Sequence, residues 1–391
     1  MMPASGIFDI VMVAAIASFT ISMLIVYTQA WHGKYSLDYD LAGIQKAHKA
    51  PIPRVGGIAV VTGILVVIIL SAIDDPYSVR HVDVDGLFLI LLAGMPAFLA
   101  GLQEDLTKKV SVKMRLLATF TSALLACWLS GAYLSRLDIP GIDTLLGFVP
   151  IAVCVTAFAV AGVANSINII DGFNGVAGSA VVIILTGLGF LAWEAGDVFI
   201  VYLALAGIGA TLGFLAVNYP TGRLFLGDGG AYLLGYLLAE VAVLLVIRNP
   251  TINAWQVFAI CAYPVIEVVF SIYRRKVIRK LSPGAPDRLH LHTLIYRRLV
   301  CQRIPVNRYR PWIRNAAVAC VVASWIAMTT FMSVAFGTTI SGALAVLLLQ
   351  VMAYLTAYKR LVRGRWTQER TVVQPSRPVM TRSGVSLRKL P

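Results

Sequence analysis

The chain has 391 residues, of which 58% are hydrophobic and only 13% are charged, and this composition excludes an ordinary soluble domain. Its formal net charge of +14 is divided among short segments between apolar runs and carries no nucleic-acid-binding motif, so we expect no nucleic-acid partner. Basic segments at membrane edges instead suit an anionic lipid bilayer. The five cysteines show neither a disulfide framework nor a metal-binding spacing.

Apolar runs near the ~20 residues needed to cross a bilayer recur along the whole chain. Eleven candidate spans lie at about residues 7–29, 55–73, 86–102, 114–133, 145–163, 176–193, 198–217, 229–247, 254–273, 315–335 and 340–358. We therefore predict an all-α polytopic membrane protein whose transmembrane domain covers residues 1–358. Residues 359–391 are basic and polar, and we expect a disordered cytoplasmic tail there.

Lysine and arginine set the expected orientation, because they collect in the cytoplasmic loops of membrane proteins. Of the 33 Lys and Arg residues, all but Arg80, Arg136 and Arg248 fall in the loops after odd-numbered spans and in the tail. The N-terminus is therefore predicted outside and the C-terminus in the cytoplasm, which requires an odd number of spans. The cytoplasmic active-site loops are expected at about residues 30–55, 103–113, 164–176, 218–228 and 274–314.

The first of these loops brings basic residues to the membrane edge just before the second span. His48, Lys49 and Arg54 accompany two prolines that keep this piece extended, and a glycine pair then lets the next helix begin close to a neighbour. The basic residues either meet an anion or simply mark the cytoplasmic side.

Two adjacent acids, Glu104 and Asp105, end the third span at a membrane edge where basic residues are the rule. A helix C-terminus disfavours negative charge through its dipole, so a cation must offset the pair. That cation is either a lysine of the same loop, such as Lys108 or Lys113, or a bound metal.

The segment 165–175 interrupts the apolar runs with amides, a carboxylate and glycines. Asn165, Asn168 and Asp171 lie three apart, so they are surface neighbours if the preceding run is helical. We expect them to gather at the mouth of a buried helix. The alternative is an ordinary polar turn between two spans.

Asp228 stands in the first turn of the eighth span, within the segment Phe-Leu-Gly-Asp-Gly-Gly. As an N-cap, this carboxylate would be satisfied without any ligand. The flanking glycines would also remove bulk around it, as a phosphate or a hydrated cation requires.

Two further acids, Glu240 and Glu267, fall inside spans, where a charge is costly, and each is expected to hydrogen-bond to a neighbouring helix. In the cytoplasmic loop at about residues 274–314, His290 and His292 lie two apart and converge only if the segment is extended. With Arg288 beside them, they suit phosphate or sugar oxygens, and they are too few for a zinc site.

All these polar clusters fall on the cytoplasmic side of a topology that was fixed from Lys and Arg alone. Carboxylates at several span ends, with basic loops and histidines, suit transfer at a diphosphate. There Mg²⁺ takes one or two carboxylates plus phosphate oxygens, and Lys or Arg balances the remaining charge. A cation-coupled transporter is the rival class, but the clustering of acids at one face argues against it.

Four segments carry a family resemblance: the Glu104-Asp105 edge, the Asn-x-x-Asn-x-x-Asp-Gly stretch, Phe-Leu-Gly-Asp-Gly-Gly and the His-Leu-His loop. In this order and at these span ends they resemble the polyprenyl-phosphate N-acetylhexosamine-1-phosphate transferases, which include the phospho-MurNAc-pentapeptide translocases. The similarity covers about residues 40–300 and extends into the last spans. The His-Leu-His loop resembles the undecaprenyl-phosphate GlcNAc-1-phosphate transferase-like branch, which starts O-antigen and other cell-surface polysaccharides.

The resemblance implies transfer of an N-acetylhexosamine 1-phosphate from a UDP-sugar to undecaprenyl phosphate, giving the lipid diphosphate sugar and UMP, with Mg²⁺ or Mn²⁺ as cofactor. It also implies a bacterial cytoplasmic membrane, with the active site on the cytoplasmic side. Metal ligation is implied for Asp228 and Asp171, and catalysis for Asp105, Glu104 and Asp171, with Asp105 and Glu104 positioning or deprotonating the lipid phosphate. Substrate contacts are implied for Lys49, Lys113, Asn165, Asn168, Asn174, Asn218, Phe225, Arg288, His290 and His292. Of these, Asn168, Asn174, Asn218 and Phe225 would hold the nucleotide, and the basic residues and histidines would hold phosphates and sugar.

Two positions depart from the family pattern. Glu104 stands where the family usually has Asp, and Thr293 stands where related enzymes commonly have another histidine. The second departure leaves the donor open between UDP-GlcNAc or a related sugar and a 6-deoxy amino sugar such as UDP-FucNAc or UDP-QuiNAc. The sequence does not report the polymer pathway, a covalent intermediate or the oligomeric state, although a homodimer is compatible with it.

Overall fold

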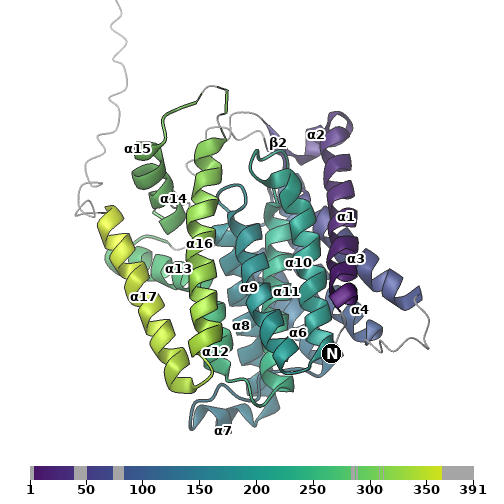
Figure 1. The fold of residues 1–391 in the computed structure, drawn as a ribbon, viewed down its shortest axis with the longest axis vertical. Coiled ribbons are helices and arrows are strands. Elements are labelled where there is room, and N and C mark those ends of the chain that lie inside the picture. Colours follow the sequence, from purple (N-terminus) through teal and green to yellow (C-terminus); the bar gives the residue numbers. More distant parts are fainter. Residues whose placement is uncertain are drawn as a thin grey trace, which may run out of the picture.

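The computed structural model describes residues 4–38, 51–73, 83–282, 287, 289–307, 309–310 and 312–362 (Figure 1). The two strands are β1 (Leu37–Asp38) and β2 (Ile52–Pro53), which pair antiparallel. The helices are α1 (Ala4–Tyr27), α2 (Gln29–Ser36), α3 (Gly56–Ile73), α4 (Val84–Ala93), α5 (Met95–Thr107), α6 (Val112–Ser130), α7 (Ile142–Leu146), α8 (Val149–Ile170), α9 (Val176–Glu194), α10 (Val198–Asn218), α11 (Gly227–Arg248), α12 (Ala254–Ile260), α13 (Ala262–Tyr273), the π-helical η1 (Arg274–Ile278), α14 (Leu291–Ile295), the π-helical η2 (Tyr296–Val300), α15 (Cys301–Arg303), α16 (Ile313–Phe336) and α17 (Ile340–Val362).

Nine helices of the described part are long and apolar enough to cross a membrane. Two helix pairs also pass when each is taken together: α4 with α5, bent by 41°, and α12 with the run that continues through α13 and η1, bent by 76°. Counting each bent pair as one span gives eleven spans, in the order and close to the boundaries predicted, so the fold class is confirmed. Helix α17 reaches Val362, so residues 359–362 of the expected tail are helical, and the rest of that tail lies outside the described residues.

Helix α11 forms the centre of the bundle, because 89% of its span is buried, against 22% for the peripheral α17. It packs against α8, α5 and α3. A Cβ atom on Gly101 of α5 would lie 2.5 Å from Gly229 N, and one on Gly57 of α3 would lie 2.4 Å from Gly230 N. The glycines that follow Asp228 therefore let helix backbones touch, and they do not provide the clearance around its carboxylate that the sequence suggested.

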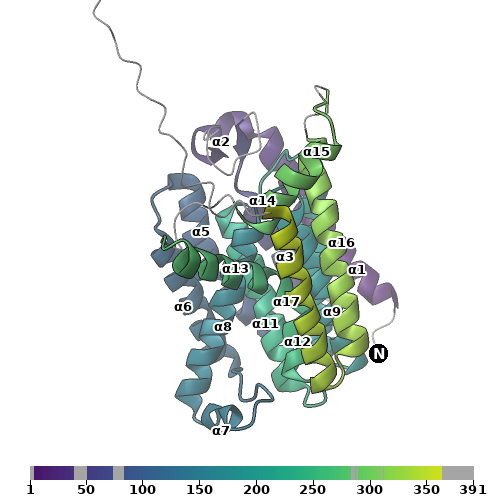
Figure 2. The same cartoon turned by 90° about the vertical axis from the view of Figure 1, so that its left-hand side faces the viewer.

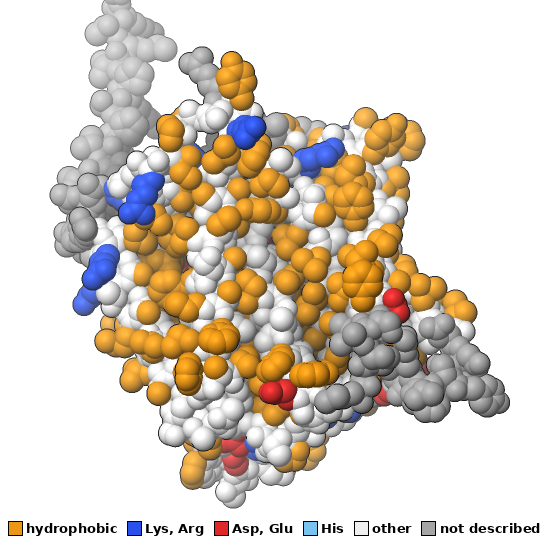
Figure 3. All heavy atoms as spheres, viewed as in Figure 1, with side chains coloured by type: hydrophobic (Ala, Val, Ile, Leu, Met, Phe, Trp, Pro, Cys, Tyr) orange, Lys and Arg blue, Asp and Glu red, His pale blue; other side chains and the backbone are white. Residues whose placement is uncertain are grey.

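The four segments singled out from the sequence meet at one end of the bundle, the end that carries α2, β2, α14 and α15 (Figures 1 and 2). Helices α5 and α8 finish at this end, and α11 begins there. Figure 3 shows that most of the Lys and Arg atoms visible on one face lie toward the same end. The side of the membrane that this end faces remains a prediction.

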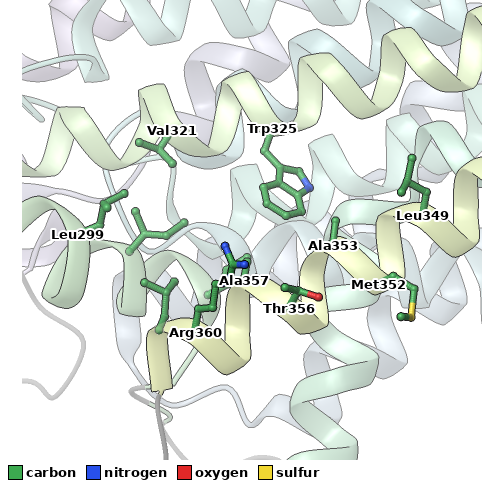
Figure 4. Close-up of a pocket in the computed structure, with 12 residues that line it drawn as sticks. Leu299, Val321, Trp325, Leu349, Met352, Ala353, Thr356, Ala357 and Arg360 are labelled. Carbon is green, nitrogen blue, oxygen red and sulfur yellow. The ribbon is translucent and has the colours of Figure 1, made fainter.

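An apolar groove of about 630 Å³ lies on the periphery of the bundle, between α14 with η2 on one side and α16 and α17 on the other. Only Thr356 and Arg360 among its lining residues are polar, and both belong to the last turns of α17. Figure 4 shows Trp325 of α16 pointing toward Ala353 of α17 across the groove. The groove therefore has an apolar length and one basic end.

Candidate active site

Asp105 caps the central helix of the bundle. Its Oδ1 accepts the N–H of Asp228 and its Oδ2 accepts the N–H of Gly229, each at 2.9 Å, and the residue is only 2% exposed. The first N–H groups of a helix lack partners within the helix, and the positive end of the helix dipole attracts an anion. The N-terminus of α11 thus stabilises the negative charge of Asp105, which the C-terminus of its own helix, α5, destabilises. Of the two cations that the sequence left open, Lys108 contributes its positive charge from the same loop, and a bound metal stays a prediction.

Arg54 lies between the acidic residues of the site. Its Nη2 is 3.4 Å from Oδ1 of Asp105 and 3.4 Å from Oδ1 of Asp228, and its Nη1 is 3.8 Å from Oδ2 of Asp38. The sequence left two interpretations open for Arg54: it contacts an anion, or it is one of the basic residues that are usual on the cytoplasmic side. The structure places its guanidinium against three carboxylates.

Main-chain pairing holds Arg54 in this position. Phe225 N donates to Pro53 O at 2.8 Å, and Gly56 N donates to Phe225 O at 2.9 Å. Proline restricts this piece to an extended backbone, as the sequence predicts, and the extended backbone then pairs with the segment that leads into α11. Phe225, expected to contact the nucleotide, therefore also anchors the start of the second span to the start of α11.

The carboxylate of Asp228 is surrounded by donors from three other segments. Its Oδ2 forms an ion pair with Nη1 of Arg115, from the first turns of α6, and its Oδ1 accepts from Nδ2 of Asn168 at 3.1 Å as well as facing Arg54. The N-cap position of α11 is Leu226, so Asp228 belongs to the first turn and does not cap its own helix. Arg115 was not singled out from the sequence.

Asp171 follows directly on the last residue of α8, with Asn168 and Asn165 one and two turns earlier. All three side chains are partly exposed, so they do gather at the mouth of a helix. Protein packed around the Asp171 carboxyl raises its pKa to about 7, whereas the positive charge of Arg54 lowers it. The negative charge of Asp171 also acts on Asp105. The charge of Arg54 therefore acts on three acids from the ends of three helices, and its guanidinium faces two of them, Asp105 and Asp228.

Asn174 and Asn218 tie the loop after α8 to the loop after α10. Asn218 Oδ1 accepts the N–H of Gly175 at 2.7 Å, and its Nδ2 donates to Leu224 O at 2.7 Å. Asn174 Nδ2 lies 3.4 Å from Pro220 O. Both amides are buried and bonded to the protein, so the structure gives them a loop-holding role, and their predicted contact with a nucleotide remains a prediction.

The two histidines meet, as expected, although only the first has an extended backbone. His290 is the N-cap of α14 with a ψ of 147°, and His292 lies in the first turn of that helix. Their rings are stacked, with centroids 5.4 Å apart and an interplanar angle of 8°. A Cβ atom on Gly172 would lie 2.8 Å from His292 Nε2. The segment 287–292, called the His loop below, therefore touches the residue next to Asp171.

The remaining predicted residues lie at the edge of the site or outside the described residues. Glu104 Oε2 accepts the N–H of Val110 at 2.7 Å, which stabilises the turn between α5 and α6. Lys113 is exposed on the first turn of α6. Lys49 and Arg288 lie outside the described residues. Arg54 carried a signal in the sequence, but Arg115 resembled any other basic residue of a cytoplasmic loop.

The donor set fits a divalent cation only if the substrate completes its coordination. Asp228, Asp171 and Asn168 offer hard oxygen ligands, and Mg²⁺ binds through one or two carboxylates plus substrate phosphates. No group of three or more His, Cys, Asp and Glu side chains suited to a metal occurs among the described residues. Around Asp228, the cationic place is taken by Arg115 and Arg54.

Fold and site together define a multi-pass membrane protein with a charged centre where helix ends meet. The model of glycosyl transferase family 4 matches residues 87–246, which include Asp105, Asp171 and Asp228. A protein of Salmonella typhi named undecaprenyl-phosphate alpha-N-acetylglucosaminyl 1-phosphate transferase is 30% identical over 267 residues, which cover 66% of this chain and 69% of the relative. The chain belongs to this family, which confirms the resemblance drawn from the four motifs.

Two further relatives carry related names. A Yersinia pestis protein with the same name is 27% identical over 266 residues, covering 66% of this chain and 69% of the relative. A Bacillus subtilis protein, named probable undecaprenyl-phosphate N-acetylglucosaminyl 1-phosphate transferase, is 28% identical over 249 residues, covering 63% of this chain and 66% of the relative. The similarity therefore spans about two thirds of each protein.

Proposed function

We propose that this protein transfers an N-acetylhexosamine 1-phosphate from a UDP-sugar to undecaprenyl phosphate, giving undecaprenyl diphosphate sugar and UMP. The observation that carries the proposal is the position of Arg54 between Asp105 and Asp228, with its charge also acting on Asp171, at the end of the bundle where Arg115 and the His loop lie. Cations set among carboxylates suit a reaction between phosphates. The names of the relatives support both substrates.

In the proposed reaction an oxygen of the lipid phosphate attacks the β-phosphorus of the UDP-sugar. A P–O bond forms to the lipid phosphate, and the P–O bond to UMP breaks, with its electron pair leaving on the UMP oxygen. Mg²⁺ or Mn²⁺ held by Asp228 and Asp171 would stabilise the charge on the diphosphate. Asn168, through its bond to Asp228, keeps that carboxylate in place.

Arg54 and Arg115 supply the positive charge that this chain itself brings to the reacting phosphates. Arg54 is about one fifth exposed and Arg115 is less exposed, so both are shielded enough for their charge to act strongly. Asp105 holds the start of α11, and hence Asp228, in position. The predicted action of Asp105 and Glu104 on the lipid phosphate itself is a separate hypothesis.

The acceptor and donor are expected to approach from different phases. The apolar groove with Arg360 at its end suits an isoprenoid chain that carries a phosphate. The UDP-sugar would enter from the cytoplasm of a bacterium, as the distribution of Lys and Arg indicates. The product would begin an O-antigen or another cell-surface polysaccharide.

Purified protein tests the reaction directly. With undecaprenyl phosphate and Mg²⁺, it should release UMP and form a lipid-linked sugar from at least one of UDP-GlcNAc, UDP-FucNAc and UDP-QuiNAc. Asp228→Ala should abolish release with every donor, whereas Asp9→Asn, on the first turns of α1 outside the site, should not. Absence of a lipid product with every donor, together with solute flux in liposomes, would contradict the proposal and favour a transporter.

A further inference from the structure

Glu267 is a fully buried acid whose role the sequence could not assign. It lies on α13, after the 76° bend, and is 0% exposed. Its Oε1 faces His290 Nδ1 at 3.0 Å, and the N–H of Leu291 lies 3.1 Å and 3.2 Å from its two oxygens. Burying a carboxylate inside a membrane span costs free energy, so such a residue is expected to have a function. Glu267 thus makes the hydrogen bonds expected of it, but to the His loop.

This bond decides which nitrogen of His290 carries a proton. An ionised carboxylate can only accept hydrogen bonds, so Nδ1 of His290 must donate. The hydrogen bond at one ring nitrogen sets the tautomer, and Nε2 is left on the opposite side of the ring as the remaining polar atom. By accepting the N–H of Leu291 as well, Glu267 also fixes the start of α14, which follows directly on His290.

His290 in turn fixes His292. The two rings are stacked, and His292 is 3% exposed, with its Nε2 against Gly172, one residue from Asp171. Nδ1 of His292 has no hydrogen-bond partner among the described residues. Burial, reinforced by the positive charge that His290 carries when protonated, lowers the pKa of His292 to about 4, so the His292 ring is neutral at pH 7. A neutral imidazole with a free polar atom suits uncharged oxygens, such as those of a sugar.

A second buried group clamps the other side of the loop. Arg274 is 0% exposed, and its Nη1 donates to Leu289 O at 2.6 Å and to Tyr358 Oη at 2.7 Å. Its Nη2 also pairs with Asp287. Burial alone would raise the pKa of Asp287, but the charge of Arg274, together with His290, Arg275 and the N–H of Leu289, holds that pKa below its usual range. The His loop is therefore held at both ends, so a tautomer set by Glu267 is not lost by loop movement.

We propose that Glu267 is a positioning residue, which fixes the tautomer of His290 and, through the stacked rings, the place of His292 beside Asp171. The inference rests on the proposed function for its kinetic consequence. Its structural part, the tautomer, does not depend on any reaction.

Nitrogen NMR of the full chain in detergent, labelled with ¹⁵N at histidine, tests the tautomer. His290→Asn identifies the His290 signals by their disappearance. In the unchanged protein at pH 8, His290 should carry its proton on Nδ1. Glu267→Gln should convert this signal to a mixture of both tautomers. An unaltered spectrum in Glu267→Gln would overturn the proposal, whether or not the protein proves to be a transferase.

Kinetics test the consequence for the sugar donor. Glu267→Gln and His290→Asn should each lower kcat/KM for the UDP-sugar by roughly 10- to 100-fold, the usual effect of losing an orienting partner. If Glu267 acts through His290, the kcat/KM of the double variant should lie within about 3-fold of that of either single variant, because the free-energy effects of coupled residues do not add. Effects that multiply would mean independent roles and overturn the proposal.

Glu240→Gln provides the matched control. Glu240 is an equally buried acid on α11, and its Oε1 has no hydrogen-bond partner within the described residues. The kcat/KM of Glu240→Gln for the UDP-sugar should stay within about 2-fold of that of the unchanged protein. Glu267→Asp, which keeps the charge, should recover part of the loss. An equal loss in Glu240→Gln, or no recovery in Glu267→Asp, would point to general destabilisation and overturn the positioning role.

Discussion

Replacement of Asp105 by Asn separates two roles that this acid combines in the hypotheses above. The structure shows it capping α11, whereas the family resemblance implies that it acts on the lipid phosphate. Asn has nearly the same size but only one acceptor oxygen. It can accept the N–H of either Asp228 or Gly229, and its amide group then faces the other N–H, donor against donor.

The cost follows from these contacts. A hydrogen bond to a charged acceptor is worth about 1.5 to 3 kcal/mol, and leaving a buried donor unpaired costs about 1 to 3 kcal/mol. The loss of negative charge at the start of α11 adds a few tenths of a kcal/mol or more. Since these terms overlap, Asp105→Asn should destabilise the protein by about 2 to 4 kcal/mol. Activity should fall with it, because the displaced N–H belongs to Asp228.

Thermal unfolding in detergent, measured beside UMP release, makes the comparison. Glu104→Gln is the control, because within the part of the chain that the structure describes its carboxylate accepts only the N–H of Val110, on a partly exposed edge. That variant should lose less than about 1 kcal/mol. If Asp105→Asn unfolded at the same temperature as the unchanged protein and yet lost its activity, capping would be refuted as the main role. A direct action on the lipid phosphate would then be favoured.

Three further predictions concern the His loop and the groove. Arg274→Met should cost about 3 kcal/mol, because the buried Asp287 loses its nearest cation and is left with Arg275 at 3.8 Å. Adding Asp287→Asn should restore thermal stability in part, and a double variant less stable than Arg274→Met would contradict this. Because His292 has its pKa lowered to about 4, the folded protein resists its protonation, so stability should fall by up to about 3 kcal/mol between pH 6.5 and pH 4. His292→Gln should lose this part of the pH dependence, and an unaltered profile would refute the buried neutral state. Filling the groove with Ala353→Phe should raise KM for undecaprenyl phosphate by roughly 3- to 10-fold while leaving a short prenyl phosphate unaffected, and Ala345→Phe on the exposed side of α17 is the control. Equal effects on both acceptors would exclude the groove as the chain site.

The spans could be predicted because each is a long apolar run, and the bilayer thickness fixes its length. The bends could not. Helices α12 and α13 read as one run over residues 254–273, and the 76° break between them becomes visible only where they pack. This break carries Glu267 toward the His loop. The sequence therefore identified an acid inside a span but could not name its partner, which comes from a segment more than twenty residues further along the chain.

The carboxylates could be predicted as a group, but the guanidiniums between them could not. Acids at membrane edges are rare enough to stand out, whereas arginines there are the rule. Arg54 and Arg115 follow different spans, and only the packing of α3, α5, α6 and α8 around α11 brings them to one carboxylate. The cap on α11 was missed for a similar reason, since its acceptor lies 123 residues earlier in the chain.

The balance of charge at the site bears on what must accompany the substrates. Asp105, Asp171 and Asp228 oppose the two guanidiniums of Arg54 and Arg115, and a diphosphate and a lipid phosphate would bring several further negative charges. Two phosphates cannot approach one another beside three carboxylates unless positive charge enters with them, because in a shielded site each unbalanced pair of charges costs several kcal/mol. Asp105 already accepts two N–H groups at the start of α11, and Arg115 pairs with Asp228, one of the carboxylates that would hold a divalent cation. If a divalent cation enters with the UDP-sugar, Asp228 and Asp171 would hold it together with phosphate oxygens, and the guanidinium of Arg115 would then balance charge on the phosphates.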